Sequence, residues 1–309
     1  MHFCKICFTQ NDIVTIISAM NKSDETIPEM LARLDENLTR AERQLAQSIL
    51  GNFPFSGLGS ITKVAQEADV STPTVVRMIK KLGFSGYPAF QQRLREELEA
   101  IVSTPIAKRD SWASSAPQEH ILNRFTESVF NNIRSTIEQV KLGDFERFCS
   151  LLGDPKRKVH IVGGRITRTL ADYLFLHLQV MRQNVIFIPS NSNTWPHYLL
   201  DVNVDDVVVI FDVRRYENTT LKLAETAAER GAKILLFTDQ WRSPIYAYAD
   251  CTLFARIAVP SAWDSNVTSL LLLEILLAEL QQRDWTGSGE RMENLERMFD
   301  KTRFFRKFQ

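Results

Sequence analysis

Five short runs of β-branched and apolar residues in the second half of the chain restrict its fold more than any other feature. The runs lie at residues 159–162, 185–188, 207–211, 234–237 and 252–254. Segments with helical periodicity separate several of them, as at 169–183 and 219–230. Apolar strands that alternate with helices are typical of a parallel sheet covered on both faces. We therefore expect an α/β sandwich with a five-stranded parallel sheet, followed by a buried apolar helix at 267–282.

Charge and composition exclude several classes of protein. The 309 residues carry 37 basic and 37 acidic side chains, so any nucleic-acid contact must come from a local patch. The longest apolar stretch is interrupted by Glu274 and is too short to cross a bilayer, and the N-terminus does not resemble a secretory signal. We expect a cytoplasmic protein with no membrane partner. Cys4 and Cys7 form a C-x-x-C pair without a second pair at metal-binding spacing, so we predict neither a metal nor a cofactor.

A helix-turn-helix is the strongest local signal in the first third of the chain. Ser60 is placed to cap a first helix, and residues 69–71 form a tight turn. Ser71 is placed to cap a second helix, which has a proline in its first turn. The apolar spacing predicts an inward face made of Val76, Ile79 and Leu82. The small polar residues at the start of the second helix then face solvent, as a recognition helix in a major groove requires.

A cationic patch accompanies this motif. Residues 71–95 contain no acidic side chain and five basic ones, which are Arg77, Lys80, Lys81, Arg93 and Arg95. Such a patch favours DNA binding through counterion release, even in a neutral protein. The alternative is a pair of helices whose charges only solvate the surface. The candidate DNA-binding residues are Ser71, Thr72, Thr74, Val75, Arg77, Lys80 and Lys81.

The same region resembles the helix-turn-helix of RpiR-family transcriptional regulators. The matching segments are Leu38-Thr39-Arg40-Ala41-Glu42-Arg43, Ser60-Ile61, Val64-Ala65, Ala68-Asp69-Val70-Ser71, Thr74-Val75-Val76-Arg77 and Leu82-Gly83-Phe84-Ser85-Gly86-Tyr87-Pro88 with Phe90. The resemblance implies that residues 71–77 contact double-stranded operator DNA. It also implies a C-terminal SIS (sugar isomerase) domain, a five-stranded parallel sandwich that binds phosphosugars beyond the carboxyl ends of its strands.

Five regions are expected from this resemblance and from the changes in composition. They are an N-terminal extension at 1–27, the helix-turn-helix domain at 28–104, a linker with a connecting helix at 105–145, the SIS effector-binding and dimerisation domain at 146–286, and a tail at 287–309. We expect a dimer or tetramer. Two linked DNA-binding domains reach the two half-sites of a palindromic operator at a higher effective concentration than separate domains do. Candidate contacts between copies are the helix at 267–282 and the phenylalanines of the tail, Phe299, Phe304, Phe305 and Phe308.

The expected ligand pocket departs from the pattern of that family. After the first strand the family has G-x-G-x-[ST], where this chain has Gly163, Gly164, Arg165 and Thr167. After the third strand the family's S-x-S-G-x-T aligns with Asp212-Val213-Arg214-Arg215-Tyr216-Glu217. Two interpretations stay open. The three arginines either clamp an anionic, carbohydrate-derived effector or pair with Asp212 and Glu217.

Further polar residues follow or precede elements at the same edge of the predicted sheet. Ser190 follows the second strand, and Asp264 and Ser265 precede the last helix. These side chains, like that of Thr167, are either ligand contacts or helix caps. The candidate ligand-binding residues are Gly163, Gly164, Arg165, Thr167, Ser190, Asp212, Arg214, Arg215, Asp264 and Ser265.

The sequence contains no catalytic arrangement that we recognise, and we predict no catalytic residues and no enzyme. A buried Glu274 would be the candidate base for sugar-phosphate isomerisation, while His160 and His177 are isolated and expected to be structural. A sugar-phosphate isomerase with an accessory helical head is one alternative. A DNA-binding protein whose second domain only oligomerises is the other.

Overall fold

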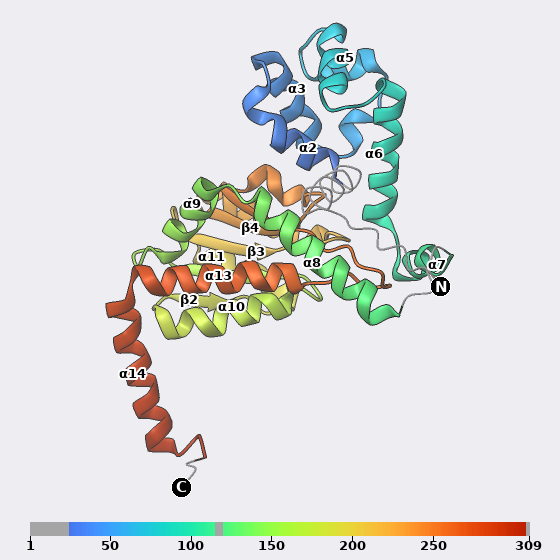
Figure 1. The fold of residues 1–309 in the computed structure, drawn as a ribbon. Coiled ribbons are helices and arrows are strands. Elements are labelled where there is room, and N and C mark those ends of the chain that lie inside the picture. Colours follow the sequence, from blue (N-terminus) through green and yellow to red (C-terminus); the bar gives the residue numbers. More distant parts are fainter. Residues whose placement is uncertain (1–24, 115–119, 307–309) are drawn as a thin grey trace, which may run out of the picture. The chain divides into compact units, whose positions relative to one another are not determined.

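The computed structural model describes residues 25–114 and 120–306 (Figure 1). They form two compact units, one ending at Leu98 and the other beginning at Glu99. We call the first the head and the second the body, and each is described by itself. Cys4, Cys7 and Phe308, which were considered above, lie outside the described residues.

The head is built from helices whose N-termini are capped by side chains. Its helices are α2 (Ile27–Leu34), α3 (Arg40–Gly51), α4 (Ile61–Glu67), α5 (Thr72–Lys81) and the start of α6 (Tyr87–Val102), with short 3-10 turns η1 (Asp35–Asn37) and η2 (Phe55–Gly57). Thr26 with Glu29, and Thr39 with Glu42, form reciprocal capping boxes at α2 and α3. Each box satisfies backbone N–H groups that a helix otherwise leaves unpaired.

Aromatic side chains hold α6 against the rest of the head. The rings of Phe84 and Phe90 meet edge to face, with centroids 5.5 Å apart. The Tyr87 hydroxyl donates to the carbonyl of Gly59 at 2.7 Å, which ties the start of α6 to the turn before α4. Gly83 has a φ of +98°, a conformation that L side chains rarely adopt, so the loop depends on this glycine.

The body contains the predicted parallel sheet. Its strands are β1 (Val159–Gly163), β2 (Val185–Phe187), β3 (Val207–Phe211), β4 (Lys233–Asp239) and β5 (Cys251–Ala255). In the described residues these five strands pair in the order β2-β1-β3-β4-β5, and every pair is parallel. The fold class expected from the sequence is confirmed.

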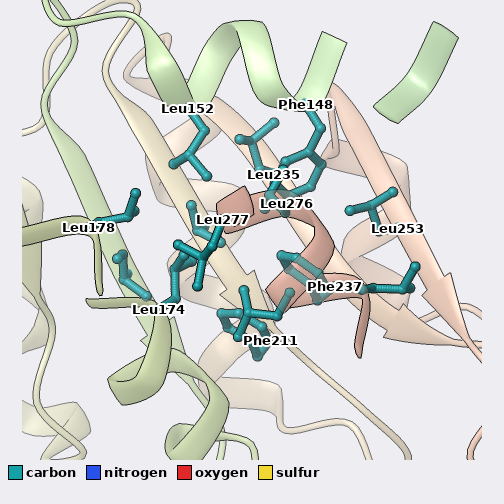
Figure 2. Packing of buried hydrophobic residues seen from close by; sticks show 14 of the residues in the cluster. Phe148, Leu152, Leu174, Leu178, Phe211, Leu235, Phe237, Leu253, Leu276 and Leu277 are labelled. Carbon is teal, nitrogen blue, oxygen red and sulfur yellow. The ribbon is translucent and has the colours of Figure 1, made fainter. Parts of the chain in front are cut away.

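Helices cover both faces of the sheet and make two separate cores. One face packs on α9 (Leu142–Gly153), α10 (Arg168–Met181) and α13 (Val267–Arg283). The other packs on α11 (Trp195–Leu200), α12 (Asn218–Glu229) and the 3-10 turn η4 (Pro244–Tyr248). Figure 2 shows the first core, where Leu152, Leu174 and Leu276 surround strand residues such as Leu235. In it Phe211 and Phe237 stack with centroids 4.5 Å apart.

Three helices differ from the expected organisation. The region expected as a linker contains α7 (Pro105–Ser114), because the Thr104 hydroxyl accepts the Ala107 N–H at 3.2 Å and Pro105 is tolerated in a first turn. The expected tail contains α14 (Trp285–Thr302). Helix α9 was not expected as a separate element, and it precedes β1. The connecting helix expected within 105–145 is α8 (Ile121–Gln139). No helix among the described residues is long and apolar enough to span a membrane.

One buried carboxylate links two helices of the head. Glu97 of α6 is only 3% exposed, and its Oε1 accepts the Ile27 N–H at the start of α2 at 2.8 Å. The same oxygen lies 3.2 Å from Nε of Arg93. Burial raises the pKa of Glu97 to about 7, against the lowering effects of the Ile27 N–H and Arg93, while the charge of Glu29 raises it further.

This shift predicts a pH-dependent stability of the head. A carboxyl whose pKa is higher in the folded state than in the unfolded state stabilises the fold at low pH, and this contribution is lost as the pH rises from about 4.5 to about 7. Replacing Glu97→Gln removes the titration and keeps an acceptor for Ile27. We expect the free energy of unfolding of the natural chain to fall relative to the variant by roughly 2 kcal/mol between pH 5 and pH 8. Urea unfolding at both pH values measures this, and parallel pH profiles would contradict it.

Candidate functional site

The helix-turn-helix of the head is formed by α4 and α5. Ser60 caps α4 by accepting the Lys63 N–H, and Ser71 caps α5 by accepting the Thr74 N–H. Between them Asp69 has a φ of +50°, which turns the chain sharply. The half-buried Val70 packs against the head core. The predicted caps and turn are all present.

The faces of α5 differ from the sequence prediction. Thr74 and Val75 are buried together with Met78, Ile79 and Leu82, whereas Val76 is 38% exposed. Residues 75, 78, 79 and 82 form one helical stripe, and packing of α5 on α3 and α4 selects this stripe for the core. The inward assignment of Val76 and the outward assignment of Thr74 and Val75 are therefore wrong.

The exposed face of α5 carries the remaining candidates for DNA contact. Ser71, Arg77 and Lys80 are exposed, and Thr72 is half-buried. Arg77 donates from Nη2 to the buried Thr74 hydroxyl at 3.1 Å, so Thr74 orients the guanidinium from below.

The cationic patch predicted from the sequence is partly neutralised. Lys81 donates to Glu42 at 2.7 Å and to the carbonyl of Asn37 at 3.0 Å. Arg93 lies beside Glu97 on α6. Arg77 and Lys80 are consequently the basic side chains that α5 itself presents without an ion pair in the described part of the chain.

A pocket of about 230 Å³ opens in the body at the carboxyl ends of β1 and β3. The chain leaves β1 toward β2 on one side and leaves β3 toward β4 on the other, so the two loops diverge. Open parallel sheets bind their ligands at such a topological switch point. Its lining residues are Ser103, Pro105, Gly164, Arg165, Ile166, Thr167, Asp212, Val213, Arg214, Arg215, Glu217, Ala262, Trp263, Asp264 and Asn266.

Thr167 stands at the N-cap position of α10, but its hydroxyl holds the first loop in place and does not cap the helix. Its hydroxyl accepts the Gly164 N–H at 2.9 Å and donates to the carbonyl of Phe211 at 2.8 Å. It makes no capping hydrogen bond to α10. Thr167 therefore occupies the predicted N-cap position without a capping side chain, and its hydroxyl instead joins the end of β1 to the end of β3.

Buried carboxyl groups lie beneath the second loop. Burial raises the pKa of Asp212 to about 7 and that of Asp239 to about 6. Asp212 accepts a hydrogen bond from the Ser243 hydroxyl. Asp239 accepts the Arg214 N–H at 2.7 Å and the Tyr216 hydroxyl at 2.7 Å. These bonds hold the loop's backbone, and they occupy Asp239 with structural contacts.

Arg214 is committed to contacts within the body. Its Nη1 donates to Asp264 Oδ1 at 3.3 Å, and its Nη2 donates to the Ser103 hydroxyl. The guanidinium also lies over the Trp241 ring, 5.2 Å from its centroid. Arg214 is therefore paired, but with Asp264 and not with Asp212 or Glu217, the partners expected from the sequence.

Arg165 and Arg215 differ from Arg214 in their contacts. Both side chains are exposed at the pocket, and among the described residues neither has a hydrogen bond or an ion pair. Arg215 has a φ of +61°, a left-handed conformation that favours glycine. The family pattern has a glycine at this position. This chain has the left-handed backbone that glycine favours, and it carries a guanidinium group there.

The pocket brings together seven of the ten candidate ligand-binding residues, and Gly163, Ser190 and Ser265 are not among its lining residues. Ser190 is exposed before the 3-10 turn η3 (Ser192–Thr194). Ser265 is buried, and its hydroxyl accepts the Val267 N–H at 3.4 Å, but the N-cap position of α13 is Asn266, so Ser265 is not the cap of this helix. Glu274 is exposed and accepts a hydrogen bond from Tyr173, so its predicted burial is wrong and it does not line the pocket.

Residues far from the predicted domain complete the pocket wall. Ser103 lies at the end of the expected helix-turn-helix domain and Pro105 at the start of the expected linker. Lys108 of α7 does not line the pocket but donates to its lining residue Asp264 at 2.6 Å. No local pattern in the sequence marks these residues, because their contacts join positions more than 100 residues apart.

Two family models match the chain. The helix-turn-helix domain of the rpiR family matches residues 25–100, and the SIS domain matches residues 152–279. The chain is 25% identical to an uncharacterised HTH-type transcriptional regulator of Clostridium perfringens, over 86% of this chain and 95% of that protein. It is 27% identical to the HTH-type transcriptional regulator HexR of Pseudomonas aeruginosa, over 81% and 87% of the two chains. The chain belongs to the rpiR family of regulators with a SIS domain.

Solved structures show the same architecture as this rpiR-family regulator. The sugar isomerase domain of an RpiR transcription factor from Sphaerobacter thermophilus superposes with a TM-score of 0.53 at 23% identity, covering 57% of this chain and 97% of that one. The NanR protein of Vibrio vulnificus, solved with ManNAc-6P, gives 0.51 at 16% identity and covers 88% and 98%. These likenesses show the fold.

The Thr167 contacts predict a stability difference between two variants. Thr167→Val keeps the shape and removes the hydroxyl, which leaves the Gly164 N–H and the Phe211 carbonyl without this partner. We expect a loss of about 1–3 kcal/mol in the free energy of unfolding. Thr167→Ser keeps the hydroxyl and should cost less than about 1 kcal/mol. Urea unfolding of the two variants measures the difference, and a valine variant as stable as the serine variant would rule out the role given to this hydroxyl.

Proposed function

We propose that this rpiR-family regulator binds double-stranded operator DNA through the exposed face of α5, and that an anionic, carbohydrate-derived effector in the body pocket controls that binding. The effector-binding part of this proposal rests on the position of Arg165 and Arg215. Their guanidinium groups are exposed at the topological switch point of the parallel sheet. The proposal places the protein's action at DNA, in the cytoplasm.

The DNA-binding part of the proposal rests on the geometry of α5. Ser71 and Thr72 offer hydroxyl groups at the start of the helix, and Arg77 and Lys80 add positive charge one and two turns later. A recognition helix contacts base edges and phosphates with this set of groups. Val76, exposed beside Arg77, provides an apolar contact for a thymine methyl group.

We also propose that the chain acts as a dimer or tetramer, because one head presents few unpaired cations and two heads on a palindrome gain effective concentration. Apolar side chains are exposed on the body, among them Phe130 of α8, Leu176 of α10, and Phe304 and Phe305 beyond α14. Most of α13 packs within its own chain, so it is a weaker candidate than the sequence implied. Sedimentation velocity measures the mass of the assembly.

The effector class follows from the side chains around the pocket. Two arginines without partners suit a phosphate or carboxylate group. Glu217 and Asp264 offer acceptors for sugar hydroxyls, and the half-exposed Trp263 ring offers an apolar face. The Vibrio vulnificus NanR structure, which contains ManNAc-6P, supports a phosphosugar or a related sugar acid as the class to test.

Sugar-phosphate isomerisation is the second candidate, and one observation favours it. Asp212 lines the pocket and has a pKa of about 7, as a general base would. Its carboxylate is buried and bonded to Ser243, however, and Glu274 does not line the pocket. We therefore propose that the chain is not an enzyme.

Arg77→Ala should weaken operator binding by about tenfold or more, because the guanidinium is the exposed cation nearest the start of α5. The control is Arg147→Ala, which removes an exposed arginine of the body that lies 3.8 Å from Asp250. Gel-shift affinity for the chain's own promoter region, at one fixed salt concentration, measures both variants. Equal affinity for Arg77→Ala and the control would exclude Arg77 from the DNA interface.

Arg215→Gly should separate ligand binding from folding. Glycine removes the guanidinium and relieves the left-handed backbone, so the unfolding free energy without ligand should stay within about 1 kcal/mol of the natural chain. The stabilisation of the natural chain by sugar phosphates and sugar acids in a thermal-shift panel should be largely lost. A variant that responds like the natural chain would remove Arg215 from the site. Turnover of a sugar phosphate in the same samples would contradict the non-enzyme proposal.

A further inference from the structure

One carboxylate oxygen in the pocket wall serves two buried cations. Asp264 Oδ1 accepts from Nζ of Lys108 at 2.6 Å and from Nη1 of Arg214 at 3.3 Å. The side chains of Lys108 and Arg214 are only 8% and 6% exposed. We call these three residues the Lys108–Asp264–Arg214 cluster. Its three groups carry two positive charges and one negative charge.

The neighbouring carboxyl groups are engaged elsewhere. Asp239 accepts the backbone N–H of Arg214, Asp212 accepts the Ser243 hydroxyl, and Glu217 accepts the backbone N–H of Arg165. Within the described residues, Asp264 is the carboxylate that forms an ion pair with Lys108 or Arg214.

Burial lowers the pKa of Lys108, the positive charge of Arg214 lowers it further, and Asp264 opposes both effects. Within the cluster itself, counted without the nearby Asp212 and Asp239, the two cations exceed the one carboxylate by one charge, and such an excess favours the arrival of an anion.

The cluster also attaches α7 to the body. Of residues 105–110, Lys108 is the buried side chain, while Ile106 is 73% exposed. Ser103, just before α7, accepts a hydrogen bond from Arg214 in the same cluster. This first half of α7 is therefore fixed by a charge contact and not by an apolar face.

We propose that Lys108 is a ligand-binding residue. Lys108 is not among the residues that line the pocket and is joined to it through Asp264. The phosphate or carboxylate group of a bound ligand is the second counter-ion of the Lys108–Asp264–Arg214 cluster, and its binding strengthens the contact by which Asp264 already holds α7. This inference rests on the proposed effector function. It adds Lys108 to the ligand-binding residues and names α7 as the element on which the ligand acts.

The position of α7 in the chain connects this contact to the head. Helix α6 contributes Phe90 and Leu94 to the head core and ends at Val102, one residue before Ser103. An anion that holds α7 restricts the segment through which the head is joined to the body. A ligand that changes the freedom of this segment shifts the population of head arrangements able to bind an operator.

The test uses inorganic phosphate as the probe and the full chain at constant ionic strength. Phosphate should raise the thermal midpoint of the natural chain, and Lys108→Met should lower its apparent affinity by about tenfold or more. Lys108→Arg, which keeps the charge, should retain binding. Asp264→Asn should bind phosphate more tightly, because it removes the competing negative charge. Lys156→Met is the matched control, an exposed lysine of the body.

Hydrogen exchange of peptides from residues 103–114 provides the second readout. Phosphate should slow this exchange in the natural chain and should not do so in Lys108→Met. Phosphate binding without slower exchange would overturn the role of α7.

Wild-type phosphate affinity in Lys108→Met, or weaker binding in Asp264→Asn, would overturn the counter-ion role while leaving the proposed function intact. If neither phosphate nor the panel of sugar phosphates and sugar acids stabilises the natural chain, the proposed effector function fails as well.

Discussion

Burial of both faces of the parallel sheet determines where polar chemistry is placed in the body. The central strands β1, β3 and β4 are covered by helices on each side, and their side chains are apolar except for His160, Lys233, Thr238 and Asp239. Polar groups gather beyond the carboxyl ends of the strands, where loops leave the sheet. Because β1 and β3 are neighbours whose chains turn in opposite directions, their loops separate and leave room for a pocket. Thr167 then joins the two strand ends through its hydroxyl.

The charges around that pocket have two different roles. Arg214 is held by Asp264, Ser103 and the Trp241 ring, so it belongs to the wall of the pocket. Arg165 and Arg215 face solvent and are the groups open to an anion. The structure shows pairing for Arg214, whereas an anion clamp formed by Arg165 and Arg215 stays a prediction. The left-handed backbone at Arg215 also explains why a glycine fits the family pattern there.

The head shows how packing chooses between two faces that a sequence leaves nearly equivalent. Val75 and Val76 are adjacent β-branched residues, and each continues an apolar spacing along α5. Contact of α5 with α3 and α4 buries Val75 and turns Val76 outward. The same packing brings Lys81 to Glu42, which is 39 residues away and which removes one predicted cation from the exposed patch. The local periodicity of the sequence predicts neither the exposure of Val76 nor the contact between Lys81 and Glu42.

The sequence alone determined the elements that depend on local interactions. Strand and helix periodicity, the caps at Ser60 and Ser71, and the loops after β1 and β3 were all predictable, because each is set by residues within a turn or two. The exposure of Glu274, the helical structure of α7, and the contacts of Ser103 and Lys108 with the pocket were not. Those contacts join residues more than 100 positions apart, and only the folded chain brings the charges close enough to interact.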